Sequence, residues 1–133
     1  MPNALENLCA AIAYPDPVPA GATAFQLHVD GGVVAARLMG SRLVLSRAIS
    51  RQEADLPKLA AYAAGRLLRE ETVLAWDERA GECILWQECP ATASAQQLTR
   101  FFETFMSSCD WWLARVADLA APPVSFPELV IVP

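Results

Sequence analysis

The sequence predicts an α+β domain in which helices pack mainly on one face of an antiparallel sheet. The strand-like runs follow one another through short turns rather than through helices, and such local hairpins give antiparallel pairing. Three segments with helical spacing lie before, between and after these runs, so the expected order is helix, three strands, helix, two strands, helix. A chain of 133 residues is the size of one domain. We therefore expect a single domain over residues 1–133, with an apolar, proline-rich tail from about residue 120.

The first helix is expected in the stretch NALENLCAAIA. Asn3 can cap its start, and Glu6 stands three residues later, where a capping box places its second member. The stretch YPDPVPAG then ends the helix, because its three prolines lack an amide donor and favour extended backbone. The apolar stripe of this helix consists of Leu5, Leu8, Cys9 and Ile12.

Three strands are expected next, in the stretches TAFQLHV, VVAARLM and RLVLSRAI. Glycine-containing turns at residues 30–32 and 40–41 separate them, which is typical of tight hairpins. In the first strand the apolar and polar side chains alternate, so one face is apolar and the other is mixed. The apolar face carries Phe25, Leu27 and Val29, and the mixed face carries Gln26 and His28.

The second helix is expected in the stretch DLPKLAAYAAGRLLREE. Its middle holds unusually small side chains, which would allow a sheet or a symmetry-related copy of the same helix to approach closely. The alternative is an ordinary helix of good helix formers that tolerates one glycine. The small residues are Ala60, Ala61, Ala63, Ala64 and Gly65.

A late hairpin and a long helix complete the predicted fold. The stretch VLAWDERAGECILWQECP reads as two strands around the turn DERAGE, and Trp76 and Trp86 flank that turn, where they would pack across the strand pair if they are opposite. The last helix has a capping box at Ser94 and Gln97 and an apolar stripe from Leu98 to Leu119.

Two neighbouring tryptophans in the last helix cannot point the same way, because adjacent helical residues diverge by about 100 degrees. Trp112 continues the apolar stripe. Trp111 therefore needs another partner, and the sequence leaves open an edge of the sheet, a second subunit or a bound chain.

Composition argues against several classes of partner. The chain has 10 Lys and Arg against 15 Asp and Glu, a net charge of -5, so nucleic acid and anionic membrane surfaces would repel it. Its 54% hydrophobic content and mean hydropathy of +0.27 are high for so short a chain, which predicts that some apolar surface contacts another protein. No apolar run is long enough to cross a bilayer, and Glu6 stands where a signal peptide would place Lys or Arg, so we expect a cytoplasmic protein without membrane insertion.

Catalytic and metal-binding patterns are missing from the sequence. His28 is the single histidine and has no nucleophile motif beside it, and the adjacent carboxylates Asp77 and Glu78 fall in a hairpin turn. The four cysteines form no C-x-x-C pair, and we expect them to be reduced and buried. The glycines lack the spacing of a phosphate-binding loop. The sequence therefore predicts no enzyme, no metal and no cofactor.

The order of elements, together with residues 72–116, resembles the Tir-chaperone family, the class I type III secretion chaperones. In this range TVLAWDERAGECILWQECP, followed by LTRFFETFMSSCDWWLARV, is similar to the family's late hairpin and last helix. The resemblance covers nearly the whole chain. It implies a cytoplasmic homodimer without enzymatic activity that holds the N-terminal segment of a secreted effector in extended form. It also implies the ATPase of the secretion apparatus as a further partner.

The resemblance implies site residues only through the elements of this chain that correspond to elements of the family. The second helix corresponds to the family's dimerisation element, which implies a dimer interface at Leu59, Tyr62, Ala63, Arg66 and Leu67. The first helix and early strands correspond to the effector-binding surface, which implies effector contacts at Leu8, Ile12, Phe25 and Leu27.

Two other functions fit the same sequence. One is a dimeric adaptor or regulator of the same fold that binds a folded partner protein. The other is a small-molecule binding domain built on an aromatic cluster of Trp76, Trp86 and Trp112.

Overall fold

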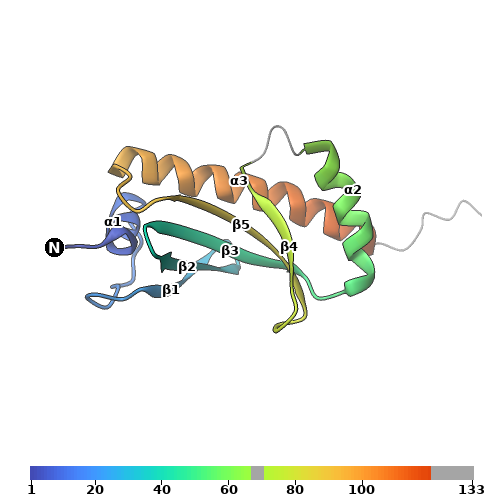
Figure 1. Cartoon of the computed structure of the whole chain (residues 1–133), viewed down its shortest axis with the longest axis horizontal. Coiled ribbons are helices and arrows are strands. Elements are labelled where there is room, and N and C mark those ends of the chain that lie inside the picture. The colour runs from blue at the N-terminus through green and yellow to red at the C-terminus, as the bar shows by residue number, and fades with distance from the viewer. Residues whose placement is uncertain (67–70, 121–133) are drawn as a thin grey trace, which may run out of the picture.

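Three α-helices and one sheet make up the described part of the chain, and the predicted order of elements is confirmed (Figure 1). The computed structural model describes residues 1–66 and 71–120, so the predicted proline-rich tail lies outside the described residues, and one domain over the whole chain stays a prediction. The strands pair only antiparallel, in the order β1-β2-β3-β5-β4, which confirms the α+β class. The elements are α1 (Ala4–Ala11), β1 (Ala24–Val29), β2 (Gly32–Met39), β3 (Arg42–Ser50), the 3-10 turn η1 (Glu53–Asp55), α2 (Leu56–Arg66), β4 (Val73–Asp77), β5 (Glu82–Pro90) and α3 (Ala95–Ala120).

The helices divide the molecule into two ends. Helix α3 runs along one face of the sheet, with α1 beside its first turns and α2 standing near its last turns (Figure 1). We call α1, residues 12–22 and β1 the α1 end, and we call η1, α2 and β4 the α2 end. The two ends carry the two outer strands of the sheet.

Local hydrogen bonds define both ends of α1. The side chain of Asn3 accepts from the backbone N–H of Glu6 at 2.9 Å, and Glu6 Oε1 accepts from the backbone N–H of Asn3 at 3.1 Å, which confirms the capping box. At the other end the N–H of Tyr14 donates to the carbonyl of Cys9 at 2.9 Å, and Ala13 has a φ of 53°. This is a Schellman motif with alanine in the position that usually holds glycine.

Turn and cap residues define the neighbouring elements in the same way. Asp30 and Gly31 join β1 to β2 with φ values of 46° and 74°, the left-handed pair that a two-residue hairpin requires. The capping box of α3 is also confirmed: the N–H of Ser94 donates to Gln97 Oε1 at 2.8 Å, and the N–H of Gln97 donates to Ser94 Oγ at 3.2 Å. These elements depend on residues close together in sequence.

The core lies between the sheet and the faces of α1 and α3 that meet it. Fully burying one leucine or phenylalanine side chain stabilises the fold by about 1.5–3 kcal/mol, so this layer supplies most of the stabilisation. Its largest fully buried apolar side chains are Leu5 and Leu8 of α1, Leu27, Val34, Leu43, Leu45 and Leu85 of the sheet, Leu59 of α2, and Leu98 and Phe105 of α3.

Trp76 and Trp86 are not opposite one another in the late hairpin, so the condition for their packing across the strand pair is not met. Trp76 pairs with Cys83 and Trp86 pairs with Val73, because the turn at residues 78–81 sets this register. Cys83, the partner of Trp76, lies three positions before Trp86 along β5, so the two indoles point to opposite faces. Trp76 packs against the core, and Trp86 lies on the face that the helices leave open.

Candidate functional site

The titratable side chains of the described residues were the first candidates for a functional site. Among residues 1–66 and 71–120, no group of three or more His, Cys, Asp or Glu side chains could hold a metal ion. Burial raises the pKa of the Cys109 thiol to about 12, and it also raises the pKa of Cys9 and Cys83. These thiols stay protonated at neutral pH, and only the thiolate is a good nucleophile or metal ligand.

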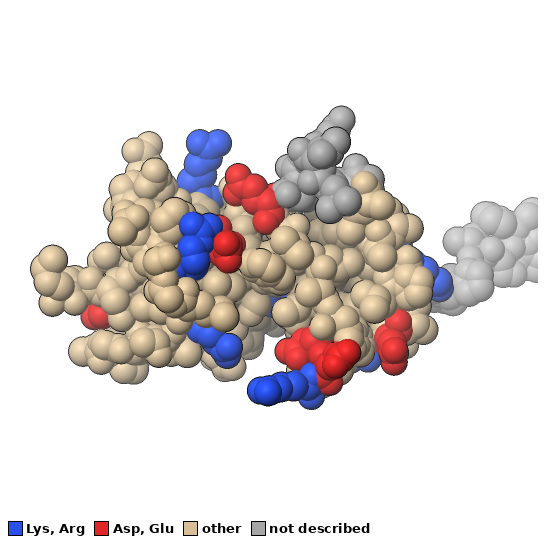
Figure 2. Space-filling view, in the orientation of Figure 1, with Lys and Arg blue, Asp and Glu red and all other residues tan. Residues whose placement is uncertain are grey.

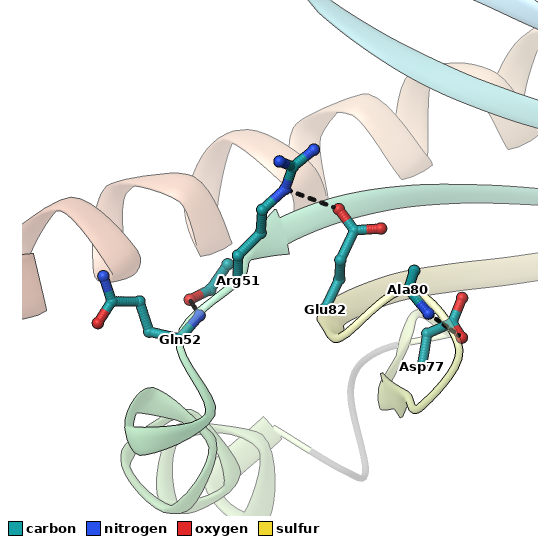
Figure 3. Close-up of polar contacts among 6 residues, drawn as sticks. Arg51, Gln52, Asp77, Ala80 and Glu82 are labelled. Carbon is teal, nitrogen blue, oxygen red and sulfur yellow. Dashed lines mark hydrogen bonds and ion pairs between the residues drawn. The ribbon is translucent and has the colours of Figure 1, made fainter.

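The carboxylates of the late hairpin act within the turn itself. Asp77 Oδ1 accepts from the backbone N–H of Arg79 at 3.0 Å and from that of Ala80 at 3.2 Å, and Figure 3 shows the second of these contacts. In the same view Glu82 Oε2 accepts from Arg51 Nε at 3.2 Å. A carboxylate that caps its own turn is a structural group. Beside these structural groups, the described residues form three surfaces that a partner could cover.

The first such surface is the sheet face opposite α1 and α3, which we call the open face. It holds a shallow groove of about 380 Å³, with the Arg42–Glu88 ion pair, at 3.2 Å, beside it. On the side of the molecule seen in Figure 2, charged residues gather in a few groups and most of the surface carries none. The apolar side chains that line the groove are Ala35, Met39, Val44, Ile84 and Trp86.

The second surface lies at the α1 end, and we call it the α1–β1 rim. It consists of Ile12, Tyr14, Val18 and Phe25, which are partly buried against the core. The rings of Tyr14 and Phe25 meet edge to face, with centroids 5.9 Å apart and planes at 87°. Partial burial leaves apolar area that a partner could cover.

The predicted effector contacts fall into two layers at this rim. Ile12 and Phe25 are partly exposed, whereas Leu8 and Leu27 have an exposed fraction of 0% and lie in the core beneath them. Their role in partner binding stays a prediction. In this conformation Leu8 and Leu27 can support the surface but cannot touch a partner.

The third surface is a groove between α2 and β4, which we call the α2–β4 groove. Its volume is about 490 Å³, and small side chains form much of its lining. Trp76 and Trp112 form part of its wall. The small residues are Ala60, Ala63 and Ala64 of α2 and Ala75 of β4.

The predicted dimer residues are placed around this groove. Leu59 is fully buried, Tyr62 is 38% exposed and Ala63 is partly exposed. The side chain of Arg66 and the whole of Leu67 lie outside the described residues. Their role in an interface stays a prediction.

Trp111 finds its partners within the chain rather than in any of the three places that the sequence left open. Its ring meets Tyr62 of α2 edge to face, with centroids 6.1 Å apart, and the guanidinium of Arg115 lies 4.8 Å from its ring centroid. Trp111 therefore helps to hold α2 against α3.

The three tryptophans proposed as a ligand-binding cluster do not come together. Trp76 and Trp112 line the α2–β4 groove, whereas Trp86 is on the open face. The cause is the register of β4 and β5, which the spacing of the two residues around the turn did not reveal.

Two residues of the α1–β1 rim, Tyr14 and Val18, were missed by sequence reasoning. Both belong to a stretch that was interpreted only as the end of the first helix. For Tyr14 a signal was present. The available signal was an aromatic residue directly before a proline and just after a helix end, where the chain often packs back on the fold.

Comparison with known proteins gives structural matches only. No known family profile matches the sequence, and no curated protein matches it. A chain of the HopA1–SchA chaperone–effector complex superposes with a TM-score of 0.67 at 18% identity, covering 83% of this chain and 90% of that chain. A chain of the heterodimeric ExoU–SpcU complex from the type III secretion system of Pseudomonas aeruginosa gives a TM-score of 0.59 at 13% identity, covering 83% and 95%.

A third similar structure has a different description. YbjN of E. coli, described as a proposed transcription regulator, superposes with a TM-score of 0.63 at 13% identity, covering 86% of this chain and 90% of that chain. At such identities the likeness shows a common fold, and one fold can serve several functions. In the described part of the chain, no helix is long and apolar enough to cross a membrane.

Proposed function

We propose that this protein is a cytoplasmic chaperone of the class I type III secretion kind, which binds the N-terminal segment of a secreted effector in extended form and keeps it competent for secretion. The observation that carries the proposal is the fold, which it has in common with chains of the HopA1–SchA and ExoU–SpcU complexes over more than four fifths of its length. The acidic, apolar composition and the uncovered apolar surfaces support it.

An extended segment suits the shape of these surfaces better than a folded partner does. The groove of the open face runs over β2, β3 and β5, and the α1–β1 rim includes Phe25 of the outer strand β1. An extended chain can pair its backbone with a strand edge while every second side chain enters a depression, so that binding is spread over a long path. Ordering such a segment costs entropy, which the apolar contacts must offset.

Within the α1–β1 rim, Ile12 and Phe25 are the proposed direct contacts. Both are partly exposed and lie above the buried Leu8 and Leu27. Substitution of the buried pair would test folding instead of binding, because a charge placed in the core without a partner destabilises the fold. The informative variants are therefore at the exposed layer.

The test is capture of a defined segment. The chain is co-expressed with the N-terminal segments of proteins encoded beside its gene, and binding is measured for the wild type and for Ile12→Asp with Phe25→Asp. We expect the double variant to lose at least tenfold in affinity, because two charged groups would lie in an apolar contact. Circular dichroism and thermal unfolding check that the variant is folded.

A matched control is Met39→Asp, which places one carboxylate on the open face, where Met39 is 54% exposed. If it retains full affinity while the double variant does not, the α1–β1 rim is the contact. The reverse result moves the segment to the open face. If no secreted segment binds the wild-type protein, the proposed function is wrong.

The oligomeric state is part of the same proposal. We place a homodimer interface at α2, because its small residues border an open groove and Tyr62 is exposed beside it. Two copies would bring these small faces together around a two-fold axis. Binding to the secretion ATPase, and the lack of enzymatic activity and of a cofactor, follow from the family resemblance and remain predictions.

The likeness to YbjN favours a second candidate, an adaptor or regulator that binds a folded protein. The conformation of the bound partner distinguishes an effector chaperone from an adaptor or regulator. Backbone amides of an effector segment held in extended form exchange rapidly outside the contact, whereas a folded partner keeps its own protected core. A small molecule in the α2–β4 groove would appear as added mass in native mass spectrometry.

A further inference from the structure

The outer edge of β1 carries backbone groups that face away from the sheet. The N–H of Leu38 donates to the carbonyl of Thr23 at 2.8 Å, so Thr23 and every second residue after it turn their backbone groups toward β2. Gln26 and His28 have the other parity and turn theirs outward. Among the described residues β1 pairs with β2 alone, so this edge is where another strand could add.

Tyr14 occupies one of these outward groups. The backbone N–H of His28 donates to the Tyr14 hydroxyl at 2.8 Å, although the two residues are 14 positions apart in sequence. The Tyr14 ring is fixed by its edge-to-face contact with Phe25. The hydroxyl therefore takes the place that a carbonyl of an added strand would have.

The position of Tyr14 is set from its own side as well. Its N–H donates to the carbonyl of Cys9 in the Schellman motif that ends α1, and Pro15 restricts the backbone that follows. Helix end and strand edge are thus joined by one side chain. Little backbone movement is needed to release the hydroxyl, because a rotation of the tyrosine side chain moves it away from β1.

We propose that Tyr14 is a latch on the outer edge of β1, closed in the free protein and displaced when an extended protein segment adds to this edge. The inference rests on the proposed function, because it concerns how the same segment is admitted. An incoming carbonyl accepts from the His28 N–H in place of the Tyr14 hydroxyl, so one hydrogen bond is exchanged for another. Because the Tyr14–His28 hydrogen bond must be broken first, the latch lowers the affinity for the segment by the free energy of that bond. In the free protein the same bond keeps the edge from pairing with unrelated strands.

The first experiment measures hydrogen exchange of the His28 amide in the free protein. Tyr14→Phe removes the hydroxyl and keeps the ring on Phe25, and Ser107→Ala, which removes an exposed hydroxyl of α3 away from β1, is the control. We expect the His28 amide to exchange its hydrogen several times faster in Tyr14→Phe and at the wild-type rate in Ser107→Ala, as followed by NMR. An unchanged rate in Tyr14→Phe would show that the hydroxyl does not hold this amide, and the latch would be wrong.

The second experiment measures binding of a short synthetic peptide in which valine and threonine alternate. A lysine at each end gives the peptide positive charge, which favours its binding to the acidic protein. We expect Tyr14→Phe to bind it about fivefold more tightly than the wild type and Ser107→Ala do, since one hydrogen bond no longer has to be broken. Amide signals of Gln26 and His28 should shift on binding.

The outcomes separate the latch from the proposed function. Equal affinity of wild type and Tyr14→Phe, or shifts confined to β4, would overturn the latch and leave capture of extended segments standing. If the peptide binds neither form, strand addition at β1 is excluded and the latch with it. The proposed function itself fails only in the capture experiment with secreted segments.

Discussion

The α1 end and the α2 end of the sheet are anchored very differently. Four of the eight residues of α1 are buried, whereas Leu59 is the one fully buried residue among those of α2 whose side chains are described. The stretch before α1 supplies a capping box, whereas Gln52 before η1 makes no side-chain cap hydrogen bond. Helix α1 thus completes its own packing, and α2 leaves a groove beside it.

This difference suggests that the two ends have different roles in binding. An end that satisfies its own backbone and buries its own apolar stripe can present a stable, latched surface to a partner. An end that holds a helix by one buried leucine and an aromatic contact from Trp111 gains more from a second copy of the chain. The following predictions test this contrast.

The largest expected effect concerns the buried leucines of the two helices. Leu8→Ala should lower the free energy of unfolding by about 2–5 kcal/mol, because it opens a cavity in the central core. Leu59→Ala should cost less in global stability, because α2 can detach and leave the sheet and α3 folded. Urea unfolding gives the global values, and hydrogen exchange of α2 amides detects the local opening. Equal global losses would remove the contrast between the two ends.

The next effect is on self-association. Ala63→Arg should raise the dimer dissociation constant at least about a hundredfold, because it places two charges near a small-residue contact between copies. The matched control is Ala10→Arg, at an exposed alanine of α1, which should leave association unchanged. Light scattering with size exclusion gives the mass. A dimer that persists in Ala63→Arg and separates in Ala10→Arg would move the interface to the α1 end.

A smaller and opposite effect is expected at the end of α1. Ala13→Gly should stabilise the protein by about 1 kcal/mol, because alanine at a φ of 53° carries a steric cost that glycine does not. Ala10→Gly, inside the helix, should destabilise it by about 0.5–1 kcal/mol. Thermal unfolding compares the two variants. If Ala13→Gly destabilises the protein, the helix end does not contribute the local order that we assign to the α1 end.

The smallest effect is in the labelling of buried thiols. Cys9 and Cys83 are buried, so each must be exposed by opening before a maleimide can reach it, and burial also raises the pKa of both thiols. Cys83 is the more buried of the two, with an exposed fraction of 0% against 6% for Cys9. It pairs with Trp76 of β4, which belongs to the α2 end, so we expect it to react a few times faster than Cys9 because that end opens more readily. Mass spectrometry of labelled peptides gives both rates. Faster labelling of Cys9 would show that the α1 end opens first.

Short-range features were predictable because neighbouring residues alone create them. Asn3 with Glu6, and Ser94 with Gln97, satisfy helix N–H groups three positions away, and the structure has both capping boxes. The antiparallel class followed from the same logic, since short turns leave no room for crossovers. The apolar stripe of α1 also placed Leu5 and Leu8 correctly in the core.

Features that join distant parts of the chain needed the tertiary structure. Trp76 and Trp86 lie close in sequence, but the register of β4 against β5 sends them to opposite faces, and one residue of turn length decides such a register. The fully buried position of Leu27 depends in the same way on which face of β1 the helices cover.

By itself the sequence determined the type and order of the elements, because caps, turns and side-chain periods act over a few residues. The tertiary structure alone decided how they meet. The Tyr14 hydroxyl reaches the His28 amide after a Schellman motif has ended α1, and the α2–β4 groove lies between two elements that are distant from Trp112 in sequence but share its wall. Both depend on packing between segments that no local pattern encodes.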